Sequence, residues 1–333
     1  MRDGRSRARR AKRSRRLNDE DRLKAISPRP VTGRRGPAGI YPMLYALFDK
    51  NERIDAAAMR RQTDALIRRG VHGIAVLGLA TEVNKMSLVE RRAMLDFVAE
   101  AVGGRVPLSV TIGEPSVPGQ IEFARAAKAA GAGWVILQTP PVRGASETAL
   151  LRFFGGVAEK VDLPIGLQIA PAYLGLDMSA SSLRALRRQH PNVALLKIES
   201  DPLTTARLIE ETEGAFTVFN GRAGLEMTDN LDAGCAGIIP GAESADRLAR
   251  IFTLHRSARA GDRARAAREY RSIAPLLTFL ETSLDNLLVY GKRILAQRLG
   301  LPEGRAAPRR PFAPPHPFGT ALAKRHARGL GRL

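Results

Sequence analysis

The sequence predicts an α/β protein, a (β/α)8 TIM barrel with a helical extension at its C-terminal end. Short apolar, β-branched runs alternate with amphipathic helical segments, and eight such units occupy about 225 residues before the strand pattern stops. Continuously apolar strands separated by helices indicate a parallel sheet that is covered on both faces. Eight units in this length approach the usual size of a barrel, about 250 residues. A doubly wound sheet is the alternative, but no GxGxxG turn follows the first run.

The expected strands are runs rich in aliphatic and β-branched residues. They lie at 39–47, 73–78, 106–113, 134–139, 163–170, 193–199, 216–221 and 237–241. Between them, apolar residues recur at spacings of three and four, as a helix with one buried face requires. The expected helices begin after residues whose side chains favour the N-cap position. These are Asp55, Ser87, Ser146, Asp201 and Ser244.

The net charge of +20 is concentrated at the two ends of the chain. Residues 1–36 carry 14 Lys and Arg against 4 Asp and Glu, and residues 301–333 carry 7 against 1. We therefore predict a basic, disordered leader (1–36), the barrel (37–261), a helical bundle (262–300) and a Pro- and Arg-rich tail (301–333). Within the tail, the Pro-rich stretch RAAPRRPFAPPHPF (305–318) is expected to run extended. The clustered arginines of the leader leave nucleic-acid binding as an alternative, although it lacks interleaved aromatic residues.

Composition argues against several classes of protein. No apolar stretch approaches the roughly 20 residues of a membrane span, and no apolar segment follows the basic N-terminus as it would in a secretory signal. The single cysteine, Cys235, excludes an intramolecular disulfide framework and is typical of a cytoplasmic protein. The five histidines show no metal-ligand spacing, so we expect neither a metal nor a cofactor.

The stretch VALLKIES (193–200) places a lysine inside an otherwise apolar strand. Burial of a cation costs free energy unless the charge is paired or neutralised. At the C-terminal end of a barrel strand, Lys197 would face the lumen together with Leu195 and Glu199. An apolar lumen would lower the pKa of Lys197 and supply the neutral amine that attacks a carbonyl to form a Schiff base. The alternative is a lysine that pairs with Glu199 or extends to the rim.

Other polar residues are weaker candidates. Glu82 follows the second strand and is either catalytic or hydrogen-bonded within its own loop. Ser87 and Glu90 have the spacing of a capping box, which explains both without catalysis. Cys235 lies in a patch of small residues and is interpreted as a packing residue.

These motifs, taken in order, resemble the dihydrodipicolinate synthase/N-acetylneuraminate lyase family of Schiff-base aldolases over residues 37–312. The matching stretches are GIAVLGLATEVNKMSLVER, LQIAPAYLG, VALLKIES, NGRAGLEMTDNLDAGCAGIIPG and YGKRILAQRLGLPEG. The resemblance implies a barrel with a C-terminal helical bundle, usually a homotetramer, in which Lys197 forms an imine with pyruvate or another 2-oxo acid. It also implies that the backbone at Gly221 and Ile239 contacts the keto acid.

The sequence departs from this family where protons and the substrate carboxylate are handled. The two threonines of the family's Gly-Thr-Thr-Gly-Glu loop are Leu79 and Ala80 here, and Thr81 replaces a glycine. Gln168 takes the position of a proton-shuttling tyrosine, and an amide is neither acid nor base near neutral pH. Tyr173 takes the position of an arginine that often binds a carboxylate. Loss of a general acid or base forfeits about 10²–10⁴-fold in rate, unless another group replaces it.

The predicted function is that of a lyase, an aldolase or dehydratase that acts on a 2-oxo acid through Lys197 but is not a true dihydrodipicolinate synthase. The predicted site has Lys197 and Gln168 at catalytic positions and Leu79, Ala80, Thr81, Tyr173, Gly221 and Ile239 at substrate-binding positions. The missing tyrosine would be replaced by Tyr173, by Glu82 or by a bound water, and Arg222 or Arg143 would hold the carboxylate. The alternatives are an impaired homologue that binds a keto or sugar acid, and a nucleic-acid-binding protein.

Overall fold

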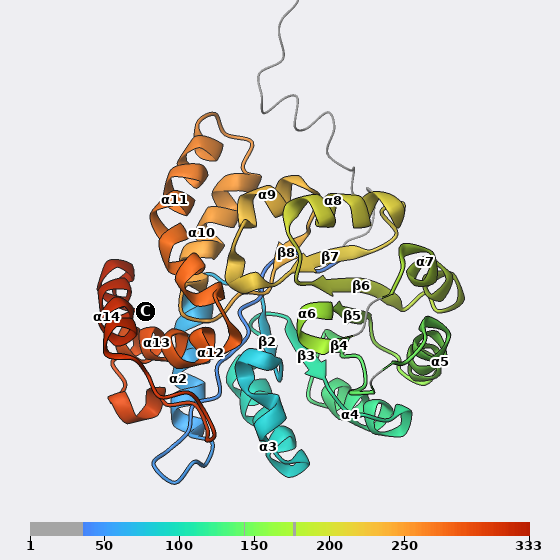
Figure 1. The fold of residues 1–333 in the computed structure, drawn as a ribbon, viewed down its shortest axis with the longest axis horizontal. Coiled ribbons are helices and arrows are strands. Elements are labelled where there is room, and N and C mark those ends of the chain that lie inside the picture. Colours follow the sequence, from blue (N-terminus) through green and yellow to red (C-terminus); the bar gives the residue numbers. More distant parts are fainter. Residues whose placement is uncertain (1–35, 143, 176–177) are drawn as a thin grey trace, which may run out of the picture.

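The computed structural model describes residues 36–142, 144–175 and 178–333, so all but the last residue of the predicted leader lies outside the described residues. Eight parallel strands form one curved sheet in the order β1-β8-β7-β6-β5-β4-β3-β2, with helices around it (Figure 1). Met43 closes the ring, because it bridges to Ala75 on one side and to Gly241 on the other. The predicted (β/α)8 barrel is confirmed.

All eight strands lie within the predicted runs. They are β1 Gly39–Ile40, β2 Ile74–Val76, β3 Leu108–Ile112, β4 Trp134–Leu137, β5 Ile165–Ile169, β6 Val193–Ile198, β7 Thr217–Asn220 and β8 Gly237–Ile238. The first strand is much shorter than its apolar run, and Pro42, just after it, has no N–H group to donate towards β2. Pro42 instead accepts a hydrogen bond from the Ala75 N–H at 3.0 Å, and the chain stays buried as it leaves the strand.

The helices that follow the strands form the outer ring. They are α2 Ala56–Arg68, α3 Leu88–Val102, α4 Val117–Ala129, α5 Glu147–Ala158, α7 Ala180–Gln189, α8 Pro202–Glu211, α9 Met227–Asp232 and α10 Ala245–Arg256. All five predicted N-cap positions are confirmed, and at four of them the side chain accepts an N–H group of the first turn. Ser244 also holds the N-cap position of α10, but its side chain accepts no N–H group, because its hydroxyl donates to the buried Glu243 carboxylate at 2.9 Å instead.

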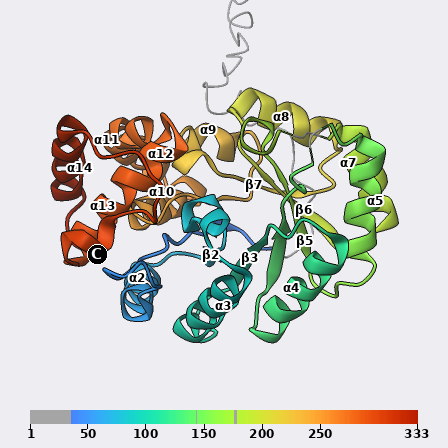
Figure 2. The same ribbon diagram turned by 60° about the horizontal axis from the view of Figure 1, so that its bottom comes forward.

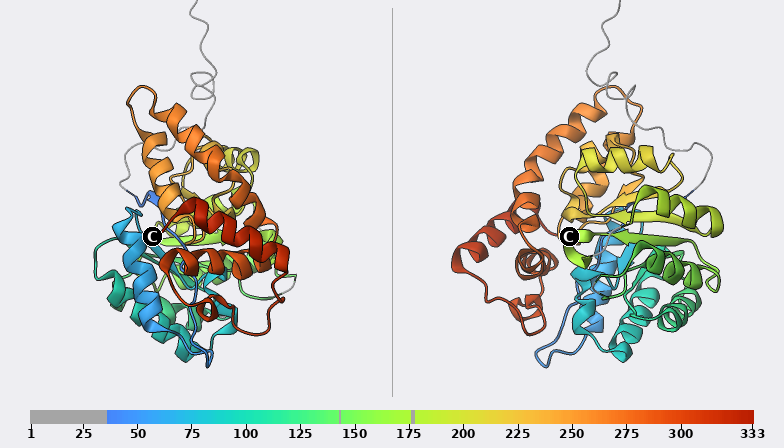
Figure 3. Two further views of the ribbon diagram at one scale, coloured as in Figure 1. Left: turned by 90° about the vertical axis from the view of Figure 1, so that its left-hand side faces the viewer. Right: turned by 45° about the vertical axis from the view of Figure 1, so that its right-hand side comes forward.

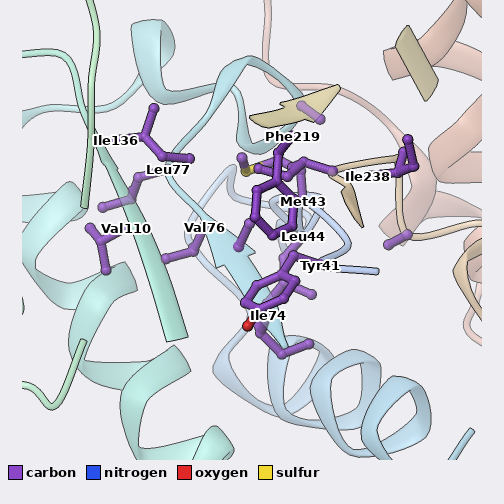
Figure 4. Packing of buried hydrophobic residues seen from close by; sticks show 14 of the residues in the cluster. Tyr41, Met43, Leu44, Ile74, Val76, Leu77, Val110, Ile136, Phe219 and Ile238 are labelled. Carbon is purple, nitrogen blue, oxygen red and sulfur yellow. The ribbon is translucent and has the colours of Figure 1, made fainter. Parts of the chain in front are cut away.

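Aromatic side chains fill the inside of the barrel. The rings of Tyr41, Trp134 and Phe219 pack with centroids 5.4–5.8 Å apart. Figure 4 shows Tyr41 and Phe219 beside Met43 and among the aliphatic side chains of neighbouring strands. Aromatic pairs at these distances stabilise a core beyond the area that they bury. The lumen is therefore a packed core, and a ligand can be held only above it, beyond the strand ends.

The C-terminal helices pack against one side of the barrel, beside α2 and α10 (Figures 2 and 3). They are α11 Asp262–Glu281, α12 Leu284–Asn286, a π-helical turn Leu287–Gly291, α13 Lys292–Leu299 and α14 Pro317–Leu330. The predicted helical extension is confirmed. No helix in the described parts of the chain is long and apolar enough to cross a membrane.

The tail beyond residue 300 ends in a helix, α14, that was not predicted from the sequence. Before it, residues 307–316 of the Pro-rich stretch lie in no helix or strand. His316 caps this helix by accepting the Phe318 N–H at 3.2 Å, and Pro317 occupies its first position. Most of its buried residues are small and lie at helical spacing, namely Gly319, Ala323 and Ala327, with Leu330 at its end. A Cβ at Gly319 would lie 2.3 Å from the ring of Tyr290, so the helix packs too closely there for any other residue. Because these residues are small, the sequence of α14 lacks the large apolar side chains at helical spacing that predict an amphipathic helix.

Two buried cations join the bundle to the barrel. The Arg298 guanidinium binds both carboxylate oxygens of Asp246, at 2.8 and 2.7 Å, and donates to the Glu243 carbonyl at 2.6 Å. The Lys292 ammonium donates to the Glu82 carboxylate at 2.6 Å, and both of these side chains are wholly buried. Buried charges are tolerated only when they are paired, so these contacts set where the bundle sits over the strand ends.

Candidate active site

A cavity lies between the C-terminal ends of the strands and the helical bundle. It holds about 550 Å³ of space, its open mouth included. Its polar lining consists of Tyr173, Lys197, Glu199, Arg222, Glu281 and Ser283. Its apolar lining includes Met43, Leu79, Ala80, Ile239, Leu284 and Leu287. The cavity is therefore apolar where it meets β2 and β8 and carries its charges near β6, β7 and α11.

Lys197 lies near the C-terminal end of β6 and points into this cavity. Its side chain is 8% exposed, and its Nζ contacts Oε1 of Glu199. Side chains two apart on a strand share a face, which explains why both reach the same space. The structure thus shows the pairing that the sequence left as an alternative. The ion pair explains how a lysine is accommodated in an apolar strand. It also places the Glu199 carboxylate beside the lysine nitrogen, where it can accept a proton.

The loop after β7 is shaped around Glu199. Oε2 of Glu199 accepts the backbone N–H of Arg222 at 2.6 Å. A Cβ at Gly221 would lie 2.2 Å from that same oxygen, so any other residue there would displace the carboxylate. Arg222 and Ala223 follow with φ of 49° and 51°, a left-handed conformation that side chains rarely adopt. Strained backbone of this kind gathers at functional sites.

Tyr173 and Glu281 come together from distant parts of the chain. Tyr173 belongs to α6 (Pro171–Leu174), a short helix after β5, and Glu281 is the last residue of α11. The tyrosine hydroxyl donates to Oε1 of Glu281 at 3.4 Å. Burial raises the pKa of Glu281 to about 7, the charge of Glu199 adds to the rise, and Arg222 opposes it. Burial and the two carboxylates raise the pKa of Tyr173 to about 12.

Two residues that the sequence singled out, Gln168 and Thr81, do not line the cavity. Gln168 is paired with Lys197 in strand register, but its buried Oε1 accepts the Gln138 amide at 3.1 Å. The Thr81 hydroxyl donates to the Leu44 carbonyl at 2.7 Å and accepts the Leu77 N–H at 3.1 Å, so it braces the loop.

Glu82 has a structural role, which decides between the two interpretations of its loop. Its carboxylate is wholly buried and accepts from Lys292 at 2.6 Å and from the Arg309 N–H at 2.9 Å. Its backbone adopts φ of 56°, and Lys85 lies 3.2 Å away. The capping box of Ser87 and Glu90 is confirmed as well.

Cys235 also lies outside the cavity. Cys235 is fully buried, and burial raises the pKa of its thiol to about 12, so it packs rather than reacts. Among the described residues, no group of three His, Cys, Asp or Glu side chains is placed to hold a metal ion. Arg143 lies outside the described residues.

Comparison with known protein families shows a match over residues 36–317 to the model described as the dihydrodipicolinate synthetase family. The chain belongs to this family. It is 30% identical to 4-hydroxy-tetrahydrodipicolinate synthase of Methanoculleus marisnigri, over 74% of this chain and 85% of that protein. It is 28% identical to a probable 2-dehydro-3-deoxy-D-pentonate aldolase of Escherichia coli, over 80% and 88%.

Solved structures of the dihydrodipicolinate synthase family have the same fold. A prophage protein of Escherichia coli from this family, in complex with pyruvate, superimposes with a TM-score of 0.79 at 26% identity, over 88% of this chain and 98% of that one. A protein from Pseudomonas aeruginosa described as a dihydrodipicolinate synthetase superimposes with a TM-score of 0.80 over 89% and 100%. The names of the relatives indicate an enzyme of the lyase or aldolase kind.

Two carboxylates of this family member were not proposed as functional residues from the sequence. Glu199 stood out only as a partner for Lys197, although its period-two spacing placed it in the same lumen. Glu281 has no local signal, because it ends an amphipathic helix as any solvated glutamate does. The packing of the bundle over the strand ends brings Glu281 to the cavity.

Proposed function

We propose that this protein is a lyase that joins Nζ of Lys197 to C2 of a 2-oxo acid as a Schiff base. The observation that supports this most is the nearly buried Lys197 at the end of β6, in contact with Glu199 and facing a cavity. Membership of the dihydrodipicolinate synthetase family and relatives named as aldolases support the same reaction class. A 2-oxo acid is supported by the pyruvate that is bound to one structural neighbour.

Glu199 has the contacts needed to manage the protons of imine formation. Its carboxylate takes a proton from the Lys197 ammonium, and the neutral amine attacks C2. The new N–C bond forms as the carbonyl electron pair moves to oxygen, which takes a proton from the nitrogen. Glu199 then returns its proton to that hydroxyl, and water leaves the iminium. The iminium is an electron sink, so the substrate can break or form a C–C bond or lose a hydroxyl.

The rest of the cavity suggests how the substrate is held. Arg222 provides a guanidinium, and we assign it to the substrate carboxylate in place of the absent threonine hydroxyls. Leu79, Ala80 and Ile239 form an apolar wall against the body of the substrate. This wall differs from a polar carboxylate site, so we propose that the substrate is not that of dihydrodipicolinate synthase. The homotetramer and the cytoplasmic location stay predictions.

Borohydride trapping tests the proposal. The protein is reduced in the presence of pyruvate, 2-oxobutyrate, 2-dehydro-3-deoxy-pentonate or 2-dehydro-3-deoxy-gluconate, and its intact mass is measured. We expect a single adduct, located at Lys197 by peptide mapping. Lys292, a second buried lysine that is paired with Glu82, is the internal control and should remain unmodified. The absence of an adduct with every acid would contradict the proposal and favour a homologue that binds without catalysis.

The variant Glu199→Gln is expected to slow imine formation with pyruvate by about 10²-fold or more. The amide cannot take the proton from Lys197 or return it to the departing hydroxyl. The measurement is rapid quenching with borohydride at increasing times. Glu211→Gln, an exposed change on α8, should leave the rate unchanged. A Glu199→Gln rate equal to that of wild type would exclude Glu199 as the proton carrier.

A further inference from the structure

The cavity contains an acid–base pair that the imine-forming step does not use. Tyr173 and Glu281 line the cavity with Lys197 and are joined by the hydrogen bond of 3.4 Å between the tyrosine hydroxyl and Oε1 of Glu281. Glu199, by contrast, is already engaged, because one oxygen contacts Lys197 and the other accepts the Arg222 N–H. Glu281 is therefore the carboxyl group of the cavity lining that is free to serve a second step.

A second step needs such a group. Once an imine has formed, any reaction at the neighbouring carbon, C3, must add or remove a proton there. Gln168, beside Lys197 in the sheet, cannot carry that proton, because an amide is neither an acid nor a base near neutral pH. Its side-chain oxygen also accepts a hydrogen bond from Gln138. Glu82 cannot carry it either, because its carboxylate is buried against Lys292.

We propose that Tyr173 and Glu281 act as a relay that moves the proton at C3 of the substrate imine. The tyrosine oxygen removes a proton from C3 while its own proton passes to the Glu281 carboxylate. The C3–H electron pair forms the C2=C3 bond, and the C=N electron pair moves to nitrogen to give a neutral enamine. The reverse transfer returns a proton to C3. This inference rests on the proposed Schiff base at Lys197.

The surroundings of Glu281 suit it to this step. The groups that face it are Tyr173 from α6, Glu199 after β6, and Arg222 and Glu226 from the loop between β7 and α9. Burial raises the pKa of Glu281 to about 7, and the two glutamates oppose its ionisation while Arg222 favours it. A carboxyl group with a pKa near the working pH both accepts and returns a proton readily. The carboxylate form is the acceptor, so proton removal should speed up as pH rises through about 7.

Exchange of the pyruvate methyl protons with D2O measures the relay without a second substrate. Proton NMR follows the loss of the methyl signal with the full chain of wild type, Glu281→Gln, Tyr173→Phe and the double variant. We expect each single change to slow exchange by about 10²-fold or more and the double variant to be no slower than the slower single, because a relay acts as a unit. The rise of the exchange rate through pH 7 should disappear in Glu281→Gln.

Borohydride trapping in parallel separates this inference from the function on which it rests. Glu281→Gln and Tyr173→Phe should still form the Lys197 adduct with pyruvate, which also shows that they fold. Glu269→Gln, on the same helix but paired with Arg250 away from the cavity, should exchange at the wild-type rate. If Glu281→Gln exchanged the pyruvate methyl protons at the wild-type rate and still formed the Lys197 adduct, the relay would be overturned and the Schiff base would stand. No adduct in wild type with pyruvate or any of the other three acids would overturn the relay and the Schiff base together.

Discussion

Replacing Lys197 by alanine should abolish the borohydride adduct and reduce pyruvate methyl exchange by about 10⁴-fold or more, because the covalent carrier is removed. The replacement also takes away the partner of Glu199. That carboxylate keeps its hydrogen bond from the Arg222 N–H and lies at a cavity edge where water can reach it. We therefore expect the variant to fold, which circular dichroism and thermal melting would show.

Lys197→Arg is the matched control for this prediction. A guanidinium keeps the positive charge and can still pair with Glu199, but it stays protonated and forms no imine. Loss of the adduct and of exchange in both variants would assign the effect to the amine rather than to charge. An adduct that persists in Lys197→Ala, at Lys292 or elsewhere, would contradict the assignment of Lys197.

Lys292→Met should lower the free energy of unfolding by about 3 kcal/mol, at the lower end of the cost of breaking a buried ion pair. The change leaves the wholly buried Glu82 carboxylate without its contact at 2.6 Å and the Ala307 carbonyl without a donor at 2.9 Å. Lys85 and the Arg309 N–H still contact Glu82, which limits the loss. Burial lowers the pKa of Lys292 to about 8, so at pH 7 the lysine is charged and the pair intact. Urea denaturation at pH 7 is the measurement.

Two further variants test whether the stability loss arises from the unpaired charge. Lys85→Met removes a longer and partly exposed contact to the same carboxylate, so it should cost about 1 kcal/mol or less. Glu82→Gln combined with Lys292→Met removes both charges and should recover part of the stability. A Lys292→Met protein within about 0.5 kcal/mol of wild type would show that this pair does not hold the bundle to the barrel.

Local patterns in the sequence were sufficient to predict the barrel and its lysine. Apolar runs and helical spacing act within a few residues, and eight strands appeared where these patterns placed them. The position of Lys197 at a strand end, with Glu199 two residues later, follows from the same side-chain period. Five N-cap positions and one capping box were also predicted, because each depends on backbone groups in a single turn.

Contacts between distant segments could not be predicted in this way. The helix α14 depends on small residues that pack closely against Tyr290. The structural role of Glu82 depends on its ion pair with Lys292, 210 residues later in the chain. Gln168 lies next to Lys197 in the sheet, yet its side-chain oxygen accepts a hydrogen bond from Gln138, which follows β4. The sequence by itself determined the barrel and the lysine, because these follow from short-range periodicity. Tertiary structure alone brought Glu281 to Tyr173, because that contact requires the bundle to be packed over the strand ends by its buried ion pairs.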